Sequence, residues 1–187
     1  MVDFVEFPKI ARLSRDIIIT EKIDGTNGCI FIGEDGEFLV GSRTKWITPE
    51  KDNHGFARWA YDHKEELSLL GPGRHFGEWW GSGIQRGYGL PKGEKRFSLF
   101  NTKRWNDEHP TCCNVVPILY EGEFNTQQIL ETMSILAING SAAAPGFMKP
   151  EGIVIYHTAA NIMFKKTFEK DEKGKGELKW MLNGLKK

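Results

Sequence analysis

Hydrophobic residues in the first part of the chain follow the two-residue period of β-strands. Residues 17–22 open with three consecutive isoleucines, and residues 28–33 alternate apolar with other side chains. A turn sequence of two acids and a glycine at 34–36 separates this run from residues 37–41, which predicts a β-hairpin. The N-terminal part is therefore expected to be rich in β-structure.

The pattern changes to helical spacing after Asp52. Apolar residues recur three or four positions apart, Asp52 or Asn53 can act as the N-cap, and Gly71 lies in a Gly-Pro-Gly sequence where a helix would end. A second amphipathic helix is predicted over residues 126–138, closed by Gly140. Two helices are therefore expected, one on each side of the middle of the chain.

The remaining segments complete a prediction of the fold class. Further strands are predicted at residues 75–80, 96–100, 115–120, 152–157 and 161–167. A glycine-rich loop is expected at 81–93, a linker at 141–146 and a charged tail at 168–187. Strands and helices mix without a regular β-α-β alternation, which favours an α+β fold with mainly antiparallel sheets. We expect a single domain over residues 1–187.

Composition narrows the class of protein only a little. The 25 basic residues equal the 25 acidic ones, so any basic surface must come from local segregation of charge. The three cysteines show neither a disulfide framework nor zinc-ligand spacing, which fits a reducing compartment. No signal peptide or membrane span is evident. The expectation is a cytoplasmic protein, in the host cytoplasm if the source is viral, with no membrane partner.

The sequence TEKIDGTNG at 20–28 raises the first question of chemistry, because Lys22 lies at the end of a predicted strand. A lone lysine in such a place is usually a surface residue. The short side chains and glycines that follow it can instead build a site around a ligand. For nucleophilic work Lys22 would have to be neutral, so its reference pKa of roughly 10.4 would have to be lowered by burial, by other cations or by a metal.

Other cations lie where such a site would need them. Arg43 and Lys45 follow the predicted hairpin, and Lys165 and Lys166 lie near the end of the last strand. Either pair alone is more often a solvated surface feature. Together with Lys22 they suggest a cage for a phosphate-rich anionic substrate.

Two acids lie in strand-like hydrophobic surroundings, where a solvated carboxylate would be poorly placed. Glu78 occurs in HFGEWWG and Glu151 in PEGIVIY. A strand-edge salt bridge is the plain alternative for each. Adjacent glycines leave room for a ligand, and a divalent ion in phosphoryl transfer needs oxygen ligands.

Around the glycine-rich loop, five further cations occur: Arg86, Lys92, Lys95, Lys103 and Arg104. Any one of them is expected to be solvated, whereas a cluster would suit a phosphate backbone.

The chain resembles the covalent nucleotidyltransferase superfamily of ATP-dependent DNA ligases, RNA ligases and mRNA capping enzymes. Six of its motifs occur in order over residues 20–167. They are Glu21 to Asn27 (motif I), Ser42-Arg43 (Ia), Phe76-Gly77-Glu78 (III), Phe97 to Phe100 (IIIa), Glu151 to Val154 (IV) and Lys165-Lys166 (V). The glutamate before the lysine and the Thr-Asn after the glycine are most similar to RNA ligases of the phage nick-sealing type. The resemblance implies an adenylation domain, ATP-grasp-like, with two mainly antiparallel sheets flanked by helices.

The same resemblance implies a role for each residue in and near motif I. Lys22 would attack the α-phosphate of ATP and carry AMP as a phosphoramide. Glu21 would lie near the adenine edge, Arg43 near the ribose, and Asn27 near the phosphate or the nucleic-acid end. Ile23 would belong to the nucleotide-binding site.

Roles are also implied for the later motifs. Glu78 would lie near the ribose, and Phe100, with Phe97 as the alternative, would stack on adenine. Glu151 would help to hold Mg²⁺ or Mn²⁺, most simply through water. Lys165 and Lys166 would contact the α-phosphate.

Three features depart from the family pattern. Motif V usually reads Lys, any residue, Lys, whereas here the lysines are adjacent and Thr167 or Phe164 takes the other place. Asn101 stands where motif IIIa often has an acid. No oligonucleotide-binding-fold domain or motif VI is expected in the chain.

The hypothesis that follows is an ATP-dependent RNA ligase that joins a 5′-phosphate to a 3′-hydroxyl, with ATP as co-substrate. Its partners would be RNA ends or nicks, including DNA-containing duplexes, and it would act as a monomer. Three alternatives stay open: a minimal DNA ligase, a capping-type guanylyltransferase, and a nucleic-acid-binding module without catalysis.

Overall fold

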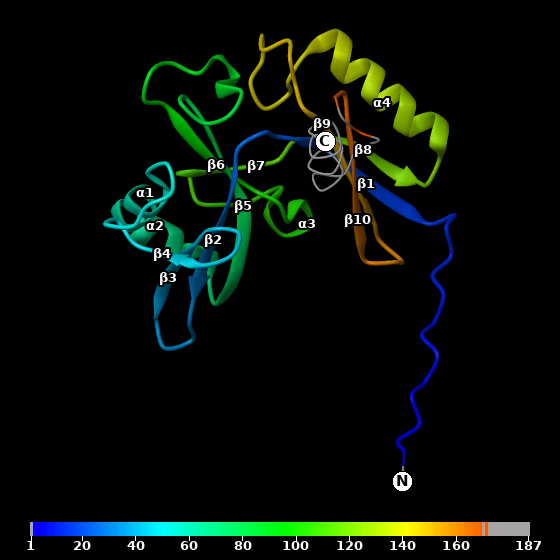
Figure 1. The fold of residues 1–187 in the computed structure, drawn as a ribbon, viewed down its shortest axis with the longest axis horizontal. Coiled ribbons are helices and arrows are strands. Elements are labelled where there is room, and N and C mark those ends of the chain that lie inside the picture. The colour runs from blue at the N-terminus through cyan, green and yellow to red at the C-terminus, as the bar shows by residue number, and fades with distance from the viewer. Residues whose placement is uncertain (1, 170, 172–187) are drawn as a thin grey trace, which may run out of the picture.

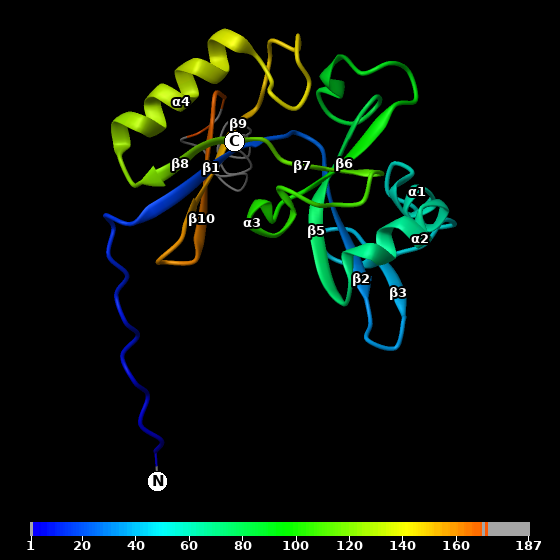
Figure 2. The same cartoon turned by 180° about the vertical axis from the view of Figure 1, so that it is seen from behind.

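Two β-sheets lie side by side in the computed structural model, which describes residues 2–169 and residue 171 (Figures 1 and 2). The first sheet has the order β10-β9-β1-β8, with β1 Asp16–Lys22, β8 Ile118–Glu123, β9 Gly152–His157 and β10 Ile162–Thr167. The second has the order β4-β3-β2-β5-β6-β7, with β2 Thr26–Ile32, β3 Phe38–Gly41, β4 Trp46–Ile47, β5 Gly73–Gly81, β6 Lys95–Leu99 and β7 Cys113–Val115. Every pairing is antiparallel except that of β6 with β7. The α+β fold with mainly antiparallel sheets is confirmed.

One face of the four-stranded sheet is covered by helix α4 (Thr126–Asn139), seen at the edge of the molecule in Figure 1. Ile17 and Ile19 of β1 are fully buried and pack with Ile153 of β9 and with Met133 and Leu136 of α4. Asn125 caps the helix by accepting a hydrogen bond from the Gln127 amide, and Gly140 ends it with φ of 78°. The predicted limits of this helix are thus confirmed to within one residue.

Aromatic residues fill the core between the six-stranded sheet and the short helices beside it, α1 (Phe56–Asp62) and α2 (Lys64–Leu67). The ring centroid of Phe56 lies 5.5 Å from that of Trp79 and 5.0 Å from that of Phe97. All three rings are almost completely buried. The second sheet therefore buries its helix-facing side and leaves the opposite side for other contacts.

The prediction of one continuous helix from Asp52 to Gly71 is wrong, because the segment is interrupted. It breaks into α1, α2 and a 3-10 turn, η1 (Ser68–Leu70), with His63 at the first break. The Nδ1 atom of His63 lies 2.8 Å from the Trp59 carbonyl oxygen. The N-cap of α1 is Gly55 and not Asp52 or Asn53 as predicted, although the carboxylate of Asp52 accepts hydrogen bonds from the amides of Ala57 and Arg58 in the first turn.

The strand predicted at residues 115–120 is also wrong as one element. Residues 113–115 form β7 in the second sheet and residues 118–123 form β8 in the first, so the chain crosses between sheets at Val116-Pro117. Short elements that the sequence did not predict are β4, η2 (Gly87–Gly89) and α3 (Thr102–Trp105).

Residues 141–146 do not form a free linker. Ser141 and Ala144 are buried, and the amide of Ala143 donates a hydrogen bond to Glu21. The predicted tail lies outside the described residues from 172 onward and at 170. In the described part of the chain, no helix has the length and apolar character needed to cross a membrane.

Candidate nucleotide site between the two sheets

Lys22 and Glu151 meet where the two sheets adjoin. Lys22 ends β1 and pairs with Gly152, the first residue of β9, so Glu151 is placed directly beside it. Nζ of Lys22 lies 2.6 Å from Oε2 of Glu151, and the two side chains are 24% and 20% exposed. Gly152 has φ of 152°, and a Cβ there would overlap the carbonyl oxygen of Lys166. Glycine is therefore required for the strand to start where it does.

Glu78 lies on β5 and is held by donors from the segment that follows Lys22. The Gly25 amide donates to Oε1 at 3.0 Å, and Nδ2 of Asn27 donates to Oε2 at 2.9 Å. Burial raises the pKa of Glu78 to about 7, with the charge of Lys22 opposing the shift and that of Glu151 adding to it. The charges of both Lys22 and Glu151 thus affect the pKa of Glu78.

Glu21 points away from this ion pair. Neighbouring residues of a strand point to opposite faces, and Glu21 lies opposite Ile153 in the register, on the face toward α4. Its Oε2 accepts a hydrogen bond of 2.9 Å from the Ala143 amide, and its Oε1 is buried without a partner among the described residues. The adjacent Ile23 is buried against Trp80.

The two adjacent lysines of β10 lie on different faces of the sheet. Lys165 pairs with Val154, which pairs with Thr20, so Lys165 shares the face of Lys22. Lys166 pairs with Ile153, on the other face, and its Nζ lies 3.0 Å from the carboxylate of Asp171. The register brings Lys165 toward the site and turns Lys166 away from it.

Thr167 completes the row of Lys22 and Gly152 across the three strands. In the Lys, any residue, Lys pattern, Lys165 is therefore the first lysine and Thr167 stands at the position of the second. Phe164, the other candidate for the missing position, lies on the face toward α4.

The aromatic candidates also separate by face. Phe97 is completely buried in the helix-facing core, which rules out stacking on a ligand in this structure. Phe100 is 39% exposed, and its amide donates to the Phe76 carbonyl at 2.9 Å. Arg43 is exposed in the turn between β3 and β4. Phe100 and Arg43 are thus available to a ligand, and Phe97 is not.

Arg86 is a residue whose placement sequence reasoning missed. Its Nε lies 3.0 Å from Oδ2 of Asp24, and its Nη1 donates to the Lys149 carbonyl at 3.3 Å. The hydroxyl of Tyr88, in the same glycine-rich loop, accepts a hydrogen bond of 2.8 Å from the Asp24 amide. Burial raises the pKa of Tyr88. The glycine-rich loop therefore contacts both motif I and the segment before Glu151. Arg86 and Asp24 are 62 residues apart in the sequence, so no local pattern predicts their contact.

Other cations near that loop serve the fold. Nζ of Lys95 donates to the His54 carbonyl at 2.7 Å, and Arg104 donates to the Leu70 carbonyl at 2.8 Å. Each of these two cations is thus held by a backbone carbonyl and is not simply solvated, contrary to the expectation for any one of them.

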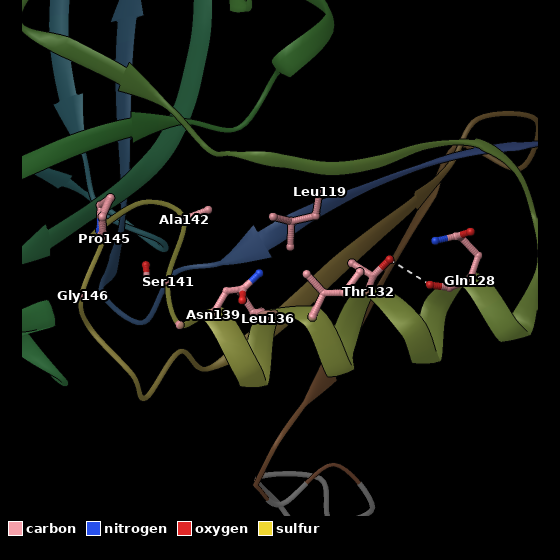
Figure 3. A pocket seen from close by; sticks show the side chains of 11 residues that line it. Leu119, Gln128, Thr132, Leu136, Asn139, Ser141, Ala142, Pro145 and Gly146 are labelled. Atoms are coloured by element: carbon pink, nitrogen blue, oxygen red, sulfur yellow. Dashed lines mark hydrogen bonds between the residues drawn. The ribbon is translucent and has the colours of Figure 1, made fainter.

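A hollow of about 250 Å³ lies elsewhere, along α4 from Gln128 to Asn139 and beside the loop at 140–146 (Figure 3). Leu119, Leu136 and Ser141 line it, and the hydroxyl of Thr132 is already bonded to the Gln128 carbonyl at 2.8 Å. Its lining includes neither Lys22, Glu78 nor Glu151, so it is separate from the candidate site.

Comparison with known proteins decides the family. A family model described as RNA ligase matches residues 15–172, which include both sheets and all of the residues above. The chain belongs to the RNA ligase family. No curated protein sequence matches it.

Solved structures of the Naegleria gruberi RNA ligase share the fold. A variant solved with AMP and manganese has a TM-score of 0.62 and 24% identity, over 83% of this chain and 50% of that one. A variant with ATP and manganese has a TM-score of 0.65 and 23% identity, over 87% and 53%. A structure with pyrophosphate has a TM-score of 0.62 and 22% identity, over 91% and 52%. The chain thus spans about half the length of these ligases.

Proposed function

We propose that this chain is the adenylating domain of an ATP-dependent RNA ligase and that Lys22 is its nucleophile. The observation that carries the proposal is the position of Lys22, partly buried against Glu151 and on the sheet face shared by Lys165. Membership of the RNA ligase family and the likeness to structures solved with ATP, AMP or pyrophosphate support it.

The first step forms one bond and breaks one. The neutral amine of Lys22 attacks the α-phosphorus of ATP, a P–N bond forms, and pyrophosphate leaves. Glu151 pairs with the charged lysine at 2.6 Å and so favours that form. A divalent ion held by Glu151 would offset this and favour the neutral amine, and the proton released as the P–N bond forms would pass to solvent. Lys165 on the same sheet face would neutralise charge that develops on the α-phosphate.

Later steps pass the AMP to RNA. An oxygen of the RNA 5′-phosphate attacks the phosphorus of lysyl-AMP, and Lys22 is released. A 3′-hydroxyl then attacks the activated 5′-phosphate and AMP leaves, so that the strand is sealed. These displacements depend mainly on in-line positioning and on neutralised charge.

The nucleotide would lie between the two sheets. Glu78, held by Gly25 and Asn27, would accept a hydrogen bond from the ribose, and Phe100 would supply a plane for the adenine. The side chain of Glu21 faces α4 and its amide donates to the Pro117 carbonyl at 3.0 Å, so a place for Glu21 near the adenine stays a prediction.

Magnesium or manganese would act at Glu151. No three histidine, cysteine, aspartate or glutamate side chains converge within residues 2–169. A single carboxylate suits a hard cation whose other ligands are phosphate oxygens and water, so the residues fit such an ion. When bound, the ion would neutralise charge on the phosphates.

The test is transfer of label from ATP to protein and then to RNA. Wild type should gain acid-labile label from α-labelled ATP but none from γ-labelled ATP, and GTP should not replace ATP. Lys22→Ala should gain none, whereas Lys103→Ala, an exposed lysine away from the site, should label as wild type. Labelling by GTP would indicate a capping-type enzyme, and transfer only to nicks with a DNA 3′-hydroxyl would indicate a DNA ligase.

A further inference from the structure

The side of the six-stranded sheet that faces away from α1 and α2 carries exposed aromatic rings. Trp46 on β4 is 47% exposed and Phe76 on β5 is 53% exposed. Phe31 on β2 is half-buried, and its ring centroid lies 6.1 Å from that of Trp46. We call Phe31, Trp46 and Phe76 the aromatic face.

Register places these rings on one side of the sheet. Trp46 pairs with Gly41, Gly41 with Cys29, and Cys29 with Phe76, so the four residues form one row across β4, β3, β2 and β5. Directly opposed residues share a face. A Cβ added to Gly41 would lie 3.1 Å from the Trp46 ring, so that ring lies over the glycine. The row therefore has an aromatic ring at each end and small residues between them.

The aromatic face adjoins the candidate nucleotide site. Phe76 is two residues before Glu78 on β5 and points to the same side of the sheet, about 7 Å along the strand. Cys29 has the same relation to Asn27 on β2. A nucleic-acid strand whose end reaches Glu78 and Lys22 can thus continue across the surface of the sheet over Phe76.

Positive charge accompanies the rings. The guanidinium carbon of Arg74 lies 5.0 Å from the Phe31 ring centroid, in a cation–π arrangement. Arg43 and Lys45 are exposed in the turn that leads to Trp46. Among residues 2–169 and 171, no ion pair includes any of these three cations. Their charge is therefore open to an anionic partner.

Exposed aromatic planes beside unpaired cations suit one kind of partner. Unpaired bases stack on aromatic side chains and on arginine, while neighbouring cations hold the phosphates. Open β-sheets that carry two or three such rings bind single-stranded RNA in this way. A protein partner would need a larger apolar area, and a duplex presents no free base planes.

We propose that the aromatic face binds unpaired nucleotides of the RNA next to the end that is joined, by stacking of bases on Trp46 and Phe76. The proposal rests on the proposed function for the identity of the strand as RNA and for its position next to the joined end. It assigns a surface that lies outside the nucleotide site and involves no bond-forming step.

The test measures binding of RNA without ATP, by fluorescence anisotropy of a labelled oligouridine of roughly ten nucleotides. Trp46→Ala and Phe76→Ala should each weaken binding about ten-fold, and the double variant about a hundred-fold. Trp46→Phe and Phe76→Tyr keep an aromatic plane and should stay within about three-fold of wild type. Leu69→Ala is the control: it removes a side chain that is 76% exposed on η1, outside the aromatic face, and should bind RNA as wild type does.

Crosslinking gives a second measurement on the unaltered protein. Oligouridine with 4-thiouridine should crosslink to peptides that contain Trp46 or Phe76. Equal binding by the double variant, absence of single-strand binding by wild type, or crosslinks confined to other peptides would each overturn the proposal. Because binding is measured without ATP, failure here leaves adenylation of Lys22 untouched, and failure of adenylation leaves this binding result standing.

Discussion

Nζ of Lys22 lies 2.6 Å from Oε2 of Glu151, although 129 residues separate the two along the chain. The contact follows from the antiparallel pairing of β1 with β9, which sets Lys22 opposite Gly152. Because a carboxylate favours the charged form of a lysine beside it, this ion pair would have to be broken before the amine can attack. The same carboxylate is the candidate ligand for a divalent ion, and an ion bound there would compete with Lys22 for it and favour the neutral amine.

Replacing Glu151 should therefore impair adenylation and alter its dependence on the metal. Glu151→Gln removes the charge but keeps the shape, and we expect the apparent affinity for magnesium to fall about 10- to 100-fold. The measurement is the initial rate of self-adenylation against magnesium concentration. Glu108→Gln, an exposed acid elsewhere, serves as the control. An unchanged magnesium curve for Glu151→Gln would remove Glu151 from the metal site.

The raised pKa of Glu78 predicts how stability depends on pH. Its pKa of about 7 exceeds the ordinary value of 4.5, so the folded protein binds a proton that the unfolded chain has lost between these values. The contribution of Glu78 to the free energy of unfolding should therefore fall as pH rises from about 4.5 to 7, by on the order of 2–3 kcal/mol.

Glu78→Gln isolates this effect, because glutamine stays neutral. Urea unfolding of wild type and variant at pH 5 and pH 8 should show the variant gaining stability relative to wild type at the higher pH. A difference that is the same at both values would mean that Glu78 titrates normally.

The two lysines of β10 form a matched pair for a test of orientation. Lys165 shares the face of Lys22, whereas Lys166 lies on the other face near Asp171. Lys165→Ala should lower the rate of self-adenylation by roughly a hundred-fold, since it removes a positive charge aimed at the phosphate. Lys166→Ala should change it less than about three-fold, because an exposed ion pair contributes little. The opposite ranking in a single-turnover assay would show that the phosphate lies on the other side of β10.

Arg86 and Asp24 should be energetically coupled. The pair is partly buried, with side chains 25% and 27% exposed, and it joins the glycine-rich loop to motif I. A double-mutant cycle of Arg86→Ala and Asp24→Asn, followed by urea unfolding, should give a coupling energy of about 1 kcal/mol. Additive effects of the two changes would mean that the contact contributes nothing in solution.

Local patterns predicted much of this architecture. The three isoleucines of β1, the limits of α4 and the strand at 152–157 follow from hydrophobic period and turn residues alone. The same period of two places Phe97 with Leu99 on the buried side of β6, so the burial of Phe97 could be predicted from the sequence.

Other features depend on contacts between distant segments. The apolar run at 115–120 reads as one strand, and only the arrangement of both sheets shows that it divides at Pro117. From the sequence alone Arg86 is expected to be a solvated arginine, and its ion pair with Asp24 is seen only in the folded structure. The orientation of Lys166 depends on the register of β10 against β9, which the sequence of either strand leaves undetermined.

The identity of the adenylated residue decides whether Lys22 is the nucleophile. Wild-type protein is incubated with ATP and magnesium, digested under conditions that preserve a P–N bond, and its peptides are mapped by mass spectrometry. We expect one adenylyl group, on the peptide that contains Lys22 and at that side chain. An adenylyl group on Lys165, Lys166 or any other residue, with Lys22 unmodified, would contradict it.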